Sequence, residues 1–281
     1  MLDALLQPLT YAFMQRGLLA AILVGIICAV IGCYVVLRSM AFLGDALAHA
    51  ILPGVAVAYL IGGNLLIGAL AAAVLVALSI GFLSRRGDLK EDTAIGILFS
   101  AALALGVALI SSIRTYAVDL SHILFGDVLG VTPADLWLTA GLGVVVIGLV
   151  AFFYRPFLVM AFDPVLATTL RWRTGLLRNL LLVLLALTIV ISMQTVGIGL
   201  VAAMLVTPAA TAYLLTRRLR VMMLLSAGIG AFSGIVGLYV SYYLNIASGA
   251  AIVLSATLFF LLAFFLAPQR GLLWQALRRN A

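Results

Sequence analysis

Residues 17–37, GLLAAILVGIICAVIGCYVVL, form a run of twenty-one residues that contains no charge. A helix of about 20 apolar residues is long enough to cross the hydrocarbon core of a bilayer. A secretory signal would have basic residues followed by an apolar core of only about 7–15 residues. We therefore interpret this run as the first membrane span of an all-α integral membrane protein.

The composition of the whole chain supports this class. Its 281 residues are 66% hydrophobic and 9% charged, with a mean hydropathy of +1.31, whereas soluble domains carry roughly 25% charged residues. The apolar runs are about 20 residues long, which is typical of helices rather than of the roughly ten-residue strands of a barrel. We predict a polytopic protein with one transmembrane domain over residues 1–281 and about nine spans, within a range of eight to ten. The eight further spans are 40–61, 65–83, 93–113, 136–154, 176–195, 197–216, 221–243 and 250–266.

The basic residues indicate how the chain is oriented. Of the 16 basic residues, all but Arg16 and Arg114 fall in segments on one side of the predicted membrane. They are Arg38, Arg85, Arg86, Lys90, Arg155, Arg171, Arg173, Arg178, Arg217, Arg218, Arg220, Arg270, Arg278 and Arg279. Because basic residues favour the cytoplasmic side, we expect the N-terminus outside and the C-terminus in the cytoplasm. The net charge of +7 then reflects orientation in a lipid membrane, and we expect no nucleic-acid partner.

The second predicted span carries two ionisable residues. Asp45 and His49 are four residues apart, so on a helix they project from one face about one turn from each other. Such groups in a bilayer are costly unless they face a cavity or a partner, which makes them functional candidates. A carboxylate oxygen and an imidazole nitrogen can together bind a divalent transition metal. The alternative is a polar pair that packs two helices together. Pro53-Gly54 and, in the seventh span, Thr207-Pro208 predict interruptions of their helices.

The segment 114–134 is too charged for a span but partly apolar. It contains Arg114, Asp119, His122 and Asp127, and we interpret it as an outer surface or re-entrant segment. His122 could form a metal entry site there, although a solvated loop histidine is the simpler interpretation.

Residues 157–170 predict a short helical segment on the cytoplasmic side. Asp163-Pro164 fits a helix start, because proline is favoured in the first helical position. Glu91 and Asp92 also fit a helix start, where the helix dipole favours acidic side chains. We interpret this last pair as helix-start charges rather than as metal ligands.

The chain has no phosphate-binding loop for ATP. Such a loop needs Gly-Lys-Ser/Thr after a glycine turn, and the single lysine, Lys90, follows Leu89. We therefore expect a transport subunit that is not itself an enzyme. If transport is driven by ATP, a separate ATPase chain must hydrolyse it.

Residues 38–54, RSMAFLGDALAHAILPG, resemble the second-helix signature of bacterial ABC permeases that import manganese, zinc or iron. The likeness covers nearly the whole chain. It continues in EDTAIGI (91–97), LFGD (124–127), FDP (162–164), VGIGLVAAMLVTPAATA (196–212) and GLYVSYY (237–243). Two departures stand out: Ala48 occupies a position where serine is common, and Arg171 one where glycine often ends the coupling helix.

The resemblance implies a multi-pass protein of the bacterial plasma (inner) membrane. Its expected partners are a second permease copy, forming a homodimer, with cytoplasmic ABC ATPase subunits and an extracytoplasmic metal-binding protein. It also implies that Asp45 and His49 bind the metal in transit, with no permanently bound cofactor. The segment 157–170, with Asp163, Pro164 and Leu166, would be the coupling helix that docks in the ATPase.

The identity of the metal stays open among manganese, zinc and iron. Cys28 and Cys33 are not placed to supply the thiolates that zinc favours, and a mixed carboxylate–imidazole site suits manganese or ferrous iron at least as well. We expect manganese first, zinc second and iron third. Two other functions compete with an ATP-driven importer: a gradient-driven secondary metal carrier, which would need further ionisable residues in its spans, and a non-transporting membrane scaffold.

Overall fold

The computed structural model describes residues 7–86, 91–112 and 128–267, and this part of the chain is helical, without a β-strand. Nine of its segments are long and apolar enough to cross a membrane, which confirms the predicted all-α class and the number of spans. The helices are η1 (Gln7–Thr10), α2 (Ala12–Leu37), α3 (Ala41–Ala50), α4 (Leu52–Leu60), α5 (Leu65–Arg86), α6 (Glu91–Ser111), α8 (Pro133–Phe152), α9 (Tyr154–Phe162), α10 (Pro164–Thr169), α11 (Thr174–Val196), α12 (Ile198–Leu215), α13 (Leu219–Leu244) and α14 (Ser248–Leu266).

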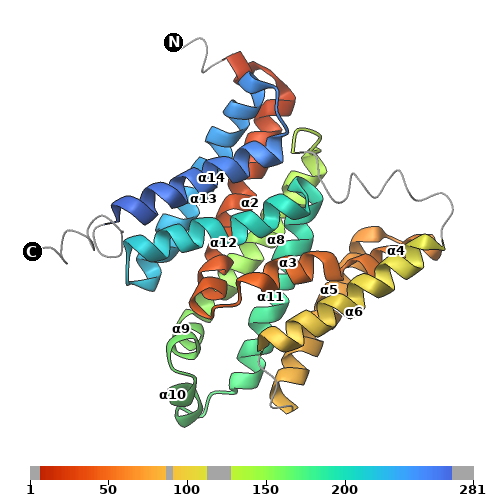
Figure 1. Cartoon of the computed structure of the whole chain (residues 1–281), viewed down its shortest axis with the longest axis vertical. Coiled ribbons are helices and arrows are strands. Elements are labelled where there is room, and N and C mark those ends of the chain that lie inside the picture. Colours follow the sequence, from red (N-terminus) through yellow and green to blue (C-terminus); the bar gives the residue numbers. More distant parts are fainter. Residues whose placement is uncertain (1–6, 87–90, 113–127, 268–281) are drawn as a thin grey trace, which may run out of the picture.

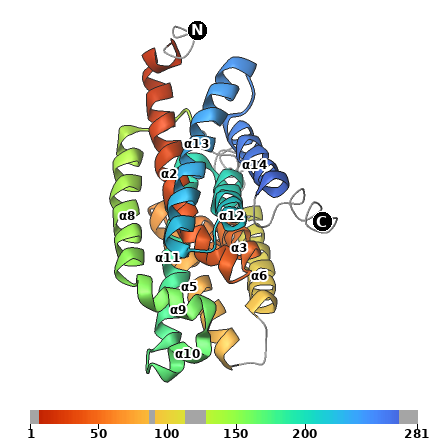
Figure 2. The same ribbon diagram turned by 90° about the vertical axis from the view of Figure 1, so that its left-hand side faces the viewer.

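The helices form two packed groups that α3 and α11 connect. One group contains α2, α12, α13 and α14, and the other contains α4, α5 and α6. Helix α11 contacts α2 and α8 as well as α5, and α3 contacts both α12 and α6. In Figures 1 and 2, α3 lies near the middle of the molecule, whereas α9 and α10 lie together at one end.

Glycines allow α2 and α13 to pack with their backbones in contact. A Cβ atom on Gly25 would lie 2.8 Å from the carbonyl carbon of Gly230, and one on Gly234 would lie 3.0 Å from the Cβ atom of Ala21. Small residues at such spacing are the usual means by which membrane helices approach closely.

The second span is two helices, as the proline predicted, but the break lies slightly earlier. Helix α3 ends at Ala50 and α4 begins at Leu52, with Pro53 in the first turn of α4. Because Pro53 has no N–H, the carbonyl of His49 four residues earlier lacks its regular helical donor. The predicted interruption at Pro208 is wrong, since α12 continues through this proline.

The predicted coupling segment 157–170 consists of two helices rather than one. Helix α9 ends at Phe162 and α10 begins at Pro164. The carboxylate of Asp163 caps α10 by accepting a hydrogen bond of 2.9 Å from the backbone N–H of Leu166. The helix start expected at Asp163-Pro164 is therefore confirmed.

Two predictions concern the ends of helices elsewhere. Most of the predicted outer segment 114–134, with His122, lies outside the described residues, and its described end forms a turn before α8. Helix α6 begins at Glu91, so both Glu91 and Asp92 lie in its first turn. Their interpretation as helix-start charges is confirmed.

Candidate metal centre

Asp45 and His49 lie one turn apart on the same face of α3. The Asp45 Oδ1 and His49 Nδ1 atoms are 3.6 Å apart, and the side chains are 45% and 29% exposed. The other face of α3 is buried, with Leu43 and Leu47 almost inaccessible. The pair therefore lies on the partly exposed side of α3, and no ion pair among the described residues links Asp45 or His49 to another helix.

A hydrogen bond determines which nitrogen of His49 can act as a ligand. His49 Nδ1 lies 3.0 Å from the backbone carbonyl oxygen of Asp45. A carbonyl oxygen only accepts, so the hydrogen bond requires the proton on Nδ1. The lone pair of the neutral ring is then on Nε2, and a histidine bound to a metal commonly donates its other N–H in this way.

Phenylalanine side chains orient the His49 ring. Phe99 of α6 packs edge-on against His49, with ring centroids 6.0 Å apart, and against Phe42, at 5.7 Å. Helix α6 therefore limits the rotation of the imidazole. Ala48, at the position where a serine was considered, is completely buried, so its side chain does not reach the open face that carries Asp45 and His49.

One chain supplies only part of a metal coordination sphere. Within the described ranges, three or more His, Cys, Asp or Glu side chains do not gather at any point. The buried cysteines are also separate from the site, since Cys28 Sγ lies 3.5 Å from Ser192 Oγ and Cys33 Sγ lies 3.3 Å from the carbonyl oxygen of Ala29. A complete site needs ligands from another source.

The predicted coupling residues lie beside exposed apolar side chains. Leu166 is 46% exposed and Phe162 is 60% exposed. We call the exposed residues Phe162, Val165, Leu166 and Leu170 the α9–α10 patch. Four apolar side chains gathered around one short helix form a surface suited to contact with a protein.

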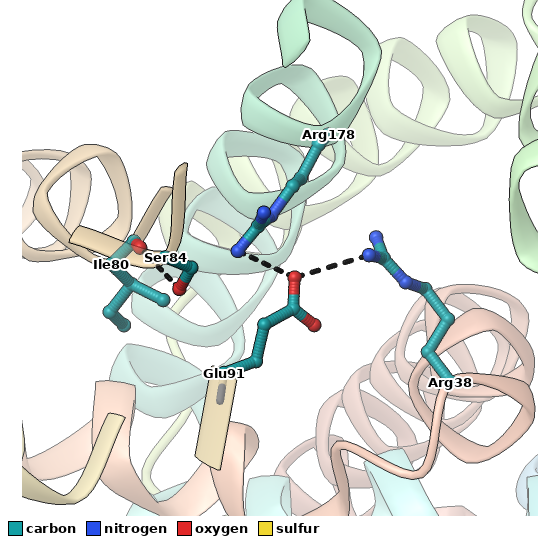
Figure 3. A network of polar contacts seen from close by, with 5 residues as sticks. All are labelled: Arg38, Ile80, Ser84, Glu91 and Arg178. Atoms are coloured by element: carbon teal, nitrogen blue, oxygen red, sulfur yellow. Dashed lines mark hydrogen bonds and ion pairs between the residues drawn. The ribbon is translucent and has the colours of Figure 1, made fainter. Parts of the chain in front are cut away.

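An ion network that the sequence reasoning missed joins three helices (Figure 3). Glu91 Oε1 lies 2.6 Å from Arg178 Nη2 and 3.2 Å from Arg38 Nη2. The only sequence signal is that all three residues lie near ends of predicted spans on the same side of the membrane. Nothing in the sequence pairs them, because Arg38, Glu91 and Arg178 belong to distant segments of the chain.

A family model described as the ABC 3 transport family matches residues 10–267. The chain belongs to this family. Its resemblance to metal-uptake ABC permeases is therefore confirmed, and the ABC 3 chain is a multi-pass membrane permease of an ABC transporter.

Relatives of the ABC 3 chain extend over almost its full length. It is 53% identical over 267 residues to the manganese transport system membrane protein MntC of Halalkalibacterium halodurans, covering 95% of this chain and 91% of the relative. It is 46% identical over 260 residues to the manganese import system permease protein ScaB of Streptococcus parasanguinis, covering 92% of each. Among solved structures, PsaBC from Streptococcus pneumoniae in complex with Fab matches with a TM-score of 0.86, 40% identity and full coverage of both chains.

Proposed function

We propose that this chain is the permease subunit of an ATP-driven importer that takes up manganese, with Asp45 and His49 as ligands in the pathway. The observation that carries the proposal is the arrangement of this pair. Two metal-binding side chains share an open face of a membrane helix, and the His49 Nδ1 contact leaves Nε2 available as a donor. An unpaired ionisable group at such a place is costly unless it has a function.

Two copies of the chain complete the site in this proposal. Each copy contributes one carboxylate and one imidazole, and a symmetric pair brings two of each around a shared axis. The partly exposed face of α3 supports this arrangement, because the side chains of Asp45 and His49 stay 45% and 29% exposed in the single chain.

The importer also needs partner chains. Membership of the ABC 3 family supports a separate cytoplasmic ATPase, which hydrolyses ATP, and an extracytoplasmic metal-binding protein. We assign ATPase docking to 157–170, through the α9–α10 patch. We propose that the chain lies in the bacterial plasma membrane with its N-terminus outside, an orientation that the distribution of its basic residues favours.

The names of the relatives and the ligand chemistry favour manganese. MntC and ScaB are both named as manganese transport proteins. Carboxylate and imidazole ligands suit Mn²⁺, although zinc binds most such sites more tightly. Zinc and iron therefore remain the second and third choices, and the binding protein and the metal supply must contribute to selectivity.

The experiment is Mn²⁺ uptake by proteoliposomes that contain the permease, its ATPase and the binding protein. Asp45→Asn and His49→Gln preserve side-chain size but remove a ligand. Each should lower uptake by at least about a hundredfold, because the loss of even an outer-shell partner of a metal ligand costs about 10–100-fold. Asp92→Asn is the matched control, because it removes an exposed membrane-end carboxylate far along the chain from the pair. Normal uptake by either ligand variant, at equal protein level, contradicts the assignment.

The same vesicles distinguish the proposal from a secondary carrier. An ATP-driven importer takes up no Mn²⁺ when ATP or the ATPase is omitted. Uptake that continues without ATP and follows an imposed proton or ion gradient supports the carrier instead.

A further inference from the structure

The Arg38–Glu91–Arg178 network connects the helix that carries the proposed metal ligands to the rest of the permease. We propose that Glu91 is a positioning residue for transport, which fixes the start of α3 through Arg38 and holds it against α11 through Arg178. This inference rests on the proposed function, because its effect is measured as metal transport.

The network has one acid between two bases. Arg38 follows the last residue of α2, Glu91 is the first residue of α6, and Arg178 lies in the second turn of α11. Their side chains are 16%, 24% and 15% exposed. Glu91 Oε1 alone contacts both guanidinium groups, so one oxygen atom holds three helices together.

The charges make Glu91 the central member. Two guanidinium groups and one carboxylate leave one net positive charge, and like charges at low solvent exposure repel each other strongly. Arg38 Nη1 is buried and has no hydrogen-bond partner among the described residues. The Arg38 guanidinium therefore depends on the Glu91 carboxylate for the compensation of its charge. Loss of the carboxylate releases the segment that Arg38 anchors.

That segment is the short connection between α2 and α3. It consists of Arg38, Ser39 and Met40, and Ser39 has a φ of 56°, in the left-handed region that few side chains favour. A short connection that holds a strained residue is suited to a change of angle between two helices.

Helix α6 contacts α3, or the residue just before it, at two points. Its first residue, Glu91, forms an ion pair with Arg38 just before α3 begins. Phe99 packs against His49. Phe99 lies about 12 Å further along α6, because a helix rises 1.5 Å per residue. A change in the Glu91 contact therefore alters both the start of α3 and the ring that is expected to bind the metal.

The end of α2 just before this connection also packs against the proposed coupling segment. Tyr34 lies one turn before Arg38 on α2, and its ring packs edge-on against Phe157 of α9 with centroids 5.6 Å apart. Both side chains are completely buried. Movement of α9 by the ATPase can thus act on the end of α2, and Glu91 determines whether α3 follows it.

The test compares Glu91→Gln with Asp92→Asn in the reconstituted complex. Both variants remove an acid from the first turn of α6, but only Glu91 contacts the arginines. We expect Glu91→Gln to lower the maximal Mn²⁺ uptake rate at least about tenfold while ATP hydrolysis and the half-saturating Mn²⁺ concentration stay within about threefold. Asp92→Asn should transport normally. Equal uptake by the two variants overturns the proposal.

A neutral triple variant separates positioning from simple charge compensation. Arg38→Gln/Glu91→Gln/Arg178→Gln removes all three charges, so no unpaired charge remains and the complex should assemble. We expect it to transport as poorly as Glu91→Gln, because the links between helices are absent. Restored uptake shows that Glu91 only compensates charge. A triple variant that fails to assemble shows that the network serves folding. Either result overturns the inference.

Failure of the proposed function has a different signature. If the unmodified complex does not take up Mn²⁺, the metal assignment is wrong. If it does take up Mn²⁺ and Glu91→Gln takes it up equally well, only the positioning role is wrong.

Discussion

At the scale of single residues, backbone conformation is as informative as side-chain chemistry. Arg171 follows α10 with a φ of 57°, a left-handed conformation that costs a side chain about 1 kcal/mol and glycine almost nothing. The structure thus gives a physical reason for the glycine that the resemblance led us to expect at the end of the proposed coupling segment.

Arg171→Gly should therefore preserve or increase stability. The relief of the left-handed conformation, about 1 kcal/mol, is partly offset by the greater entropy of glycine in the unfolded chain. Arg173→Gly is the matched control, because Arg173 has a φ of −76° and gains no such relief. Thermal unfolding of the two purified variants measures the difference. A lower melting temperature for Arg171→Gly than for Arg173→Gly contradicts the argument.

The proposed metal ligands could be selected from the sequence, but their geometry could not. The spacing of Asp45 and His49 predicted a shared helix face, and that is where they lie. The hydrogen bond that fixes the His49 ring depends on the backbone of α3, and its packing partner, Phe99, is fifty residues further along the chain. Long-range contacts of this kind leave no local pattern in the sequence.

At the scale of helices, the structure explains which glycines are replaceable. A Cβ atom on Gly230 would lie 2.6 Å from the carbonyl oxygen of Gly25, whereas one on Gly228 of the same helix meets no atom within 4 Å. Two glycines four residues apart, Gly230 and Gly234, are typical of closely packed membrane helices, and the structure identifies α2 as the partner helix.

We predict that Gly230→Ala destabilises the permease by about 1–3 kcal/mol, the usual cost of overpacking. Gly228→Ala should be neutral or stabilising by up to about 1 kcal/mol, since alanine is the better helix former. Thermal unfolding in detergent compares the two variants. Similar melting temperatures for both would show that α2 and α13 can separate without loss of stability.

The α9–α10 patch leads to a prediction about coupling. Leu166→Asp places a charge on an exposed apolar surface, so we expect the ATPase to dissociate and uptake to fall at least about tenfold, because a buried unpaired charge at an interface is costly. Thr168→Asp adds the same charge to an exposed polar position of α10 and should have a smaller effect. Copurification of the ATPase measures binding. If Leu166→Asp binds and transports normally, docking lies elsewhere, and residues 84–92 become the next candidate.

At the scale of the whole molecule, the number and order of spans followed from hydropathy alone. The nine predicted spans agree with the described helices to within a few residues at most ends. The main differences have local causes. The first span begins earlier, at Ala12, because Arg16 is accommodated in the helix and donates a hydrogen bond to the carbonyl oxygen of Ala12.

A competition assay tests the identity of the metal at this scale. With the complete transporter, we expect Mn²⁺ uptake to exceed Zn²⁺ uptake at equal free concentrations. The binding protein must supply this preference, because carboxylate and imidazole ligands alone favour zinc. Uptake of Zn²⁺ without Mn²⁺ shows that the manganese assignment is wrong.

The proposed pair of ligands has a consequence for the valence of the cargo. In the proposed site, His49 binds the metal through the Nε2 lone pair of a neutral ring and Asp45 through its carboxylate, so each chain brings one negative charge to the pathway. A pair of chains then offers two negative charges, which a divalent cation neutralises. A monovalent ion leaves one excess negative charge and a trivalent ion one excess positive charge, and either is costly inside a bilayer. Under the proposed function, we therefore expect the permease to favour the double charge that manganese, zinc and ferrous iron share over the charges of ferric iron and alkali ions.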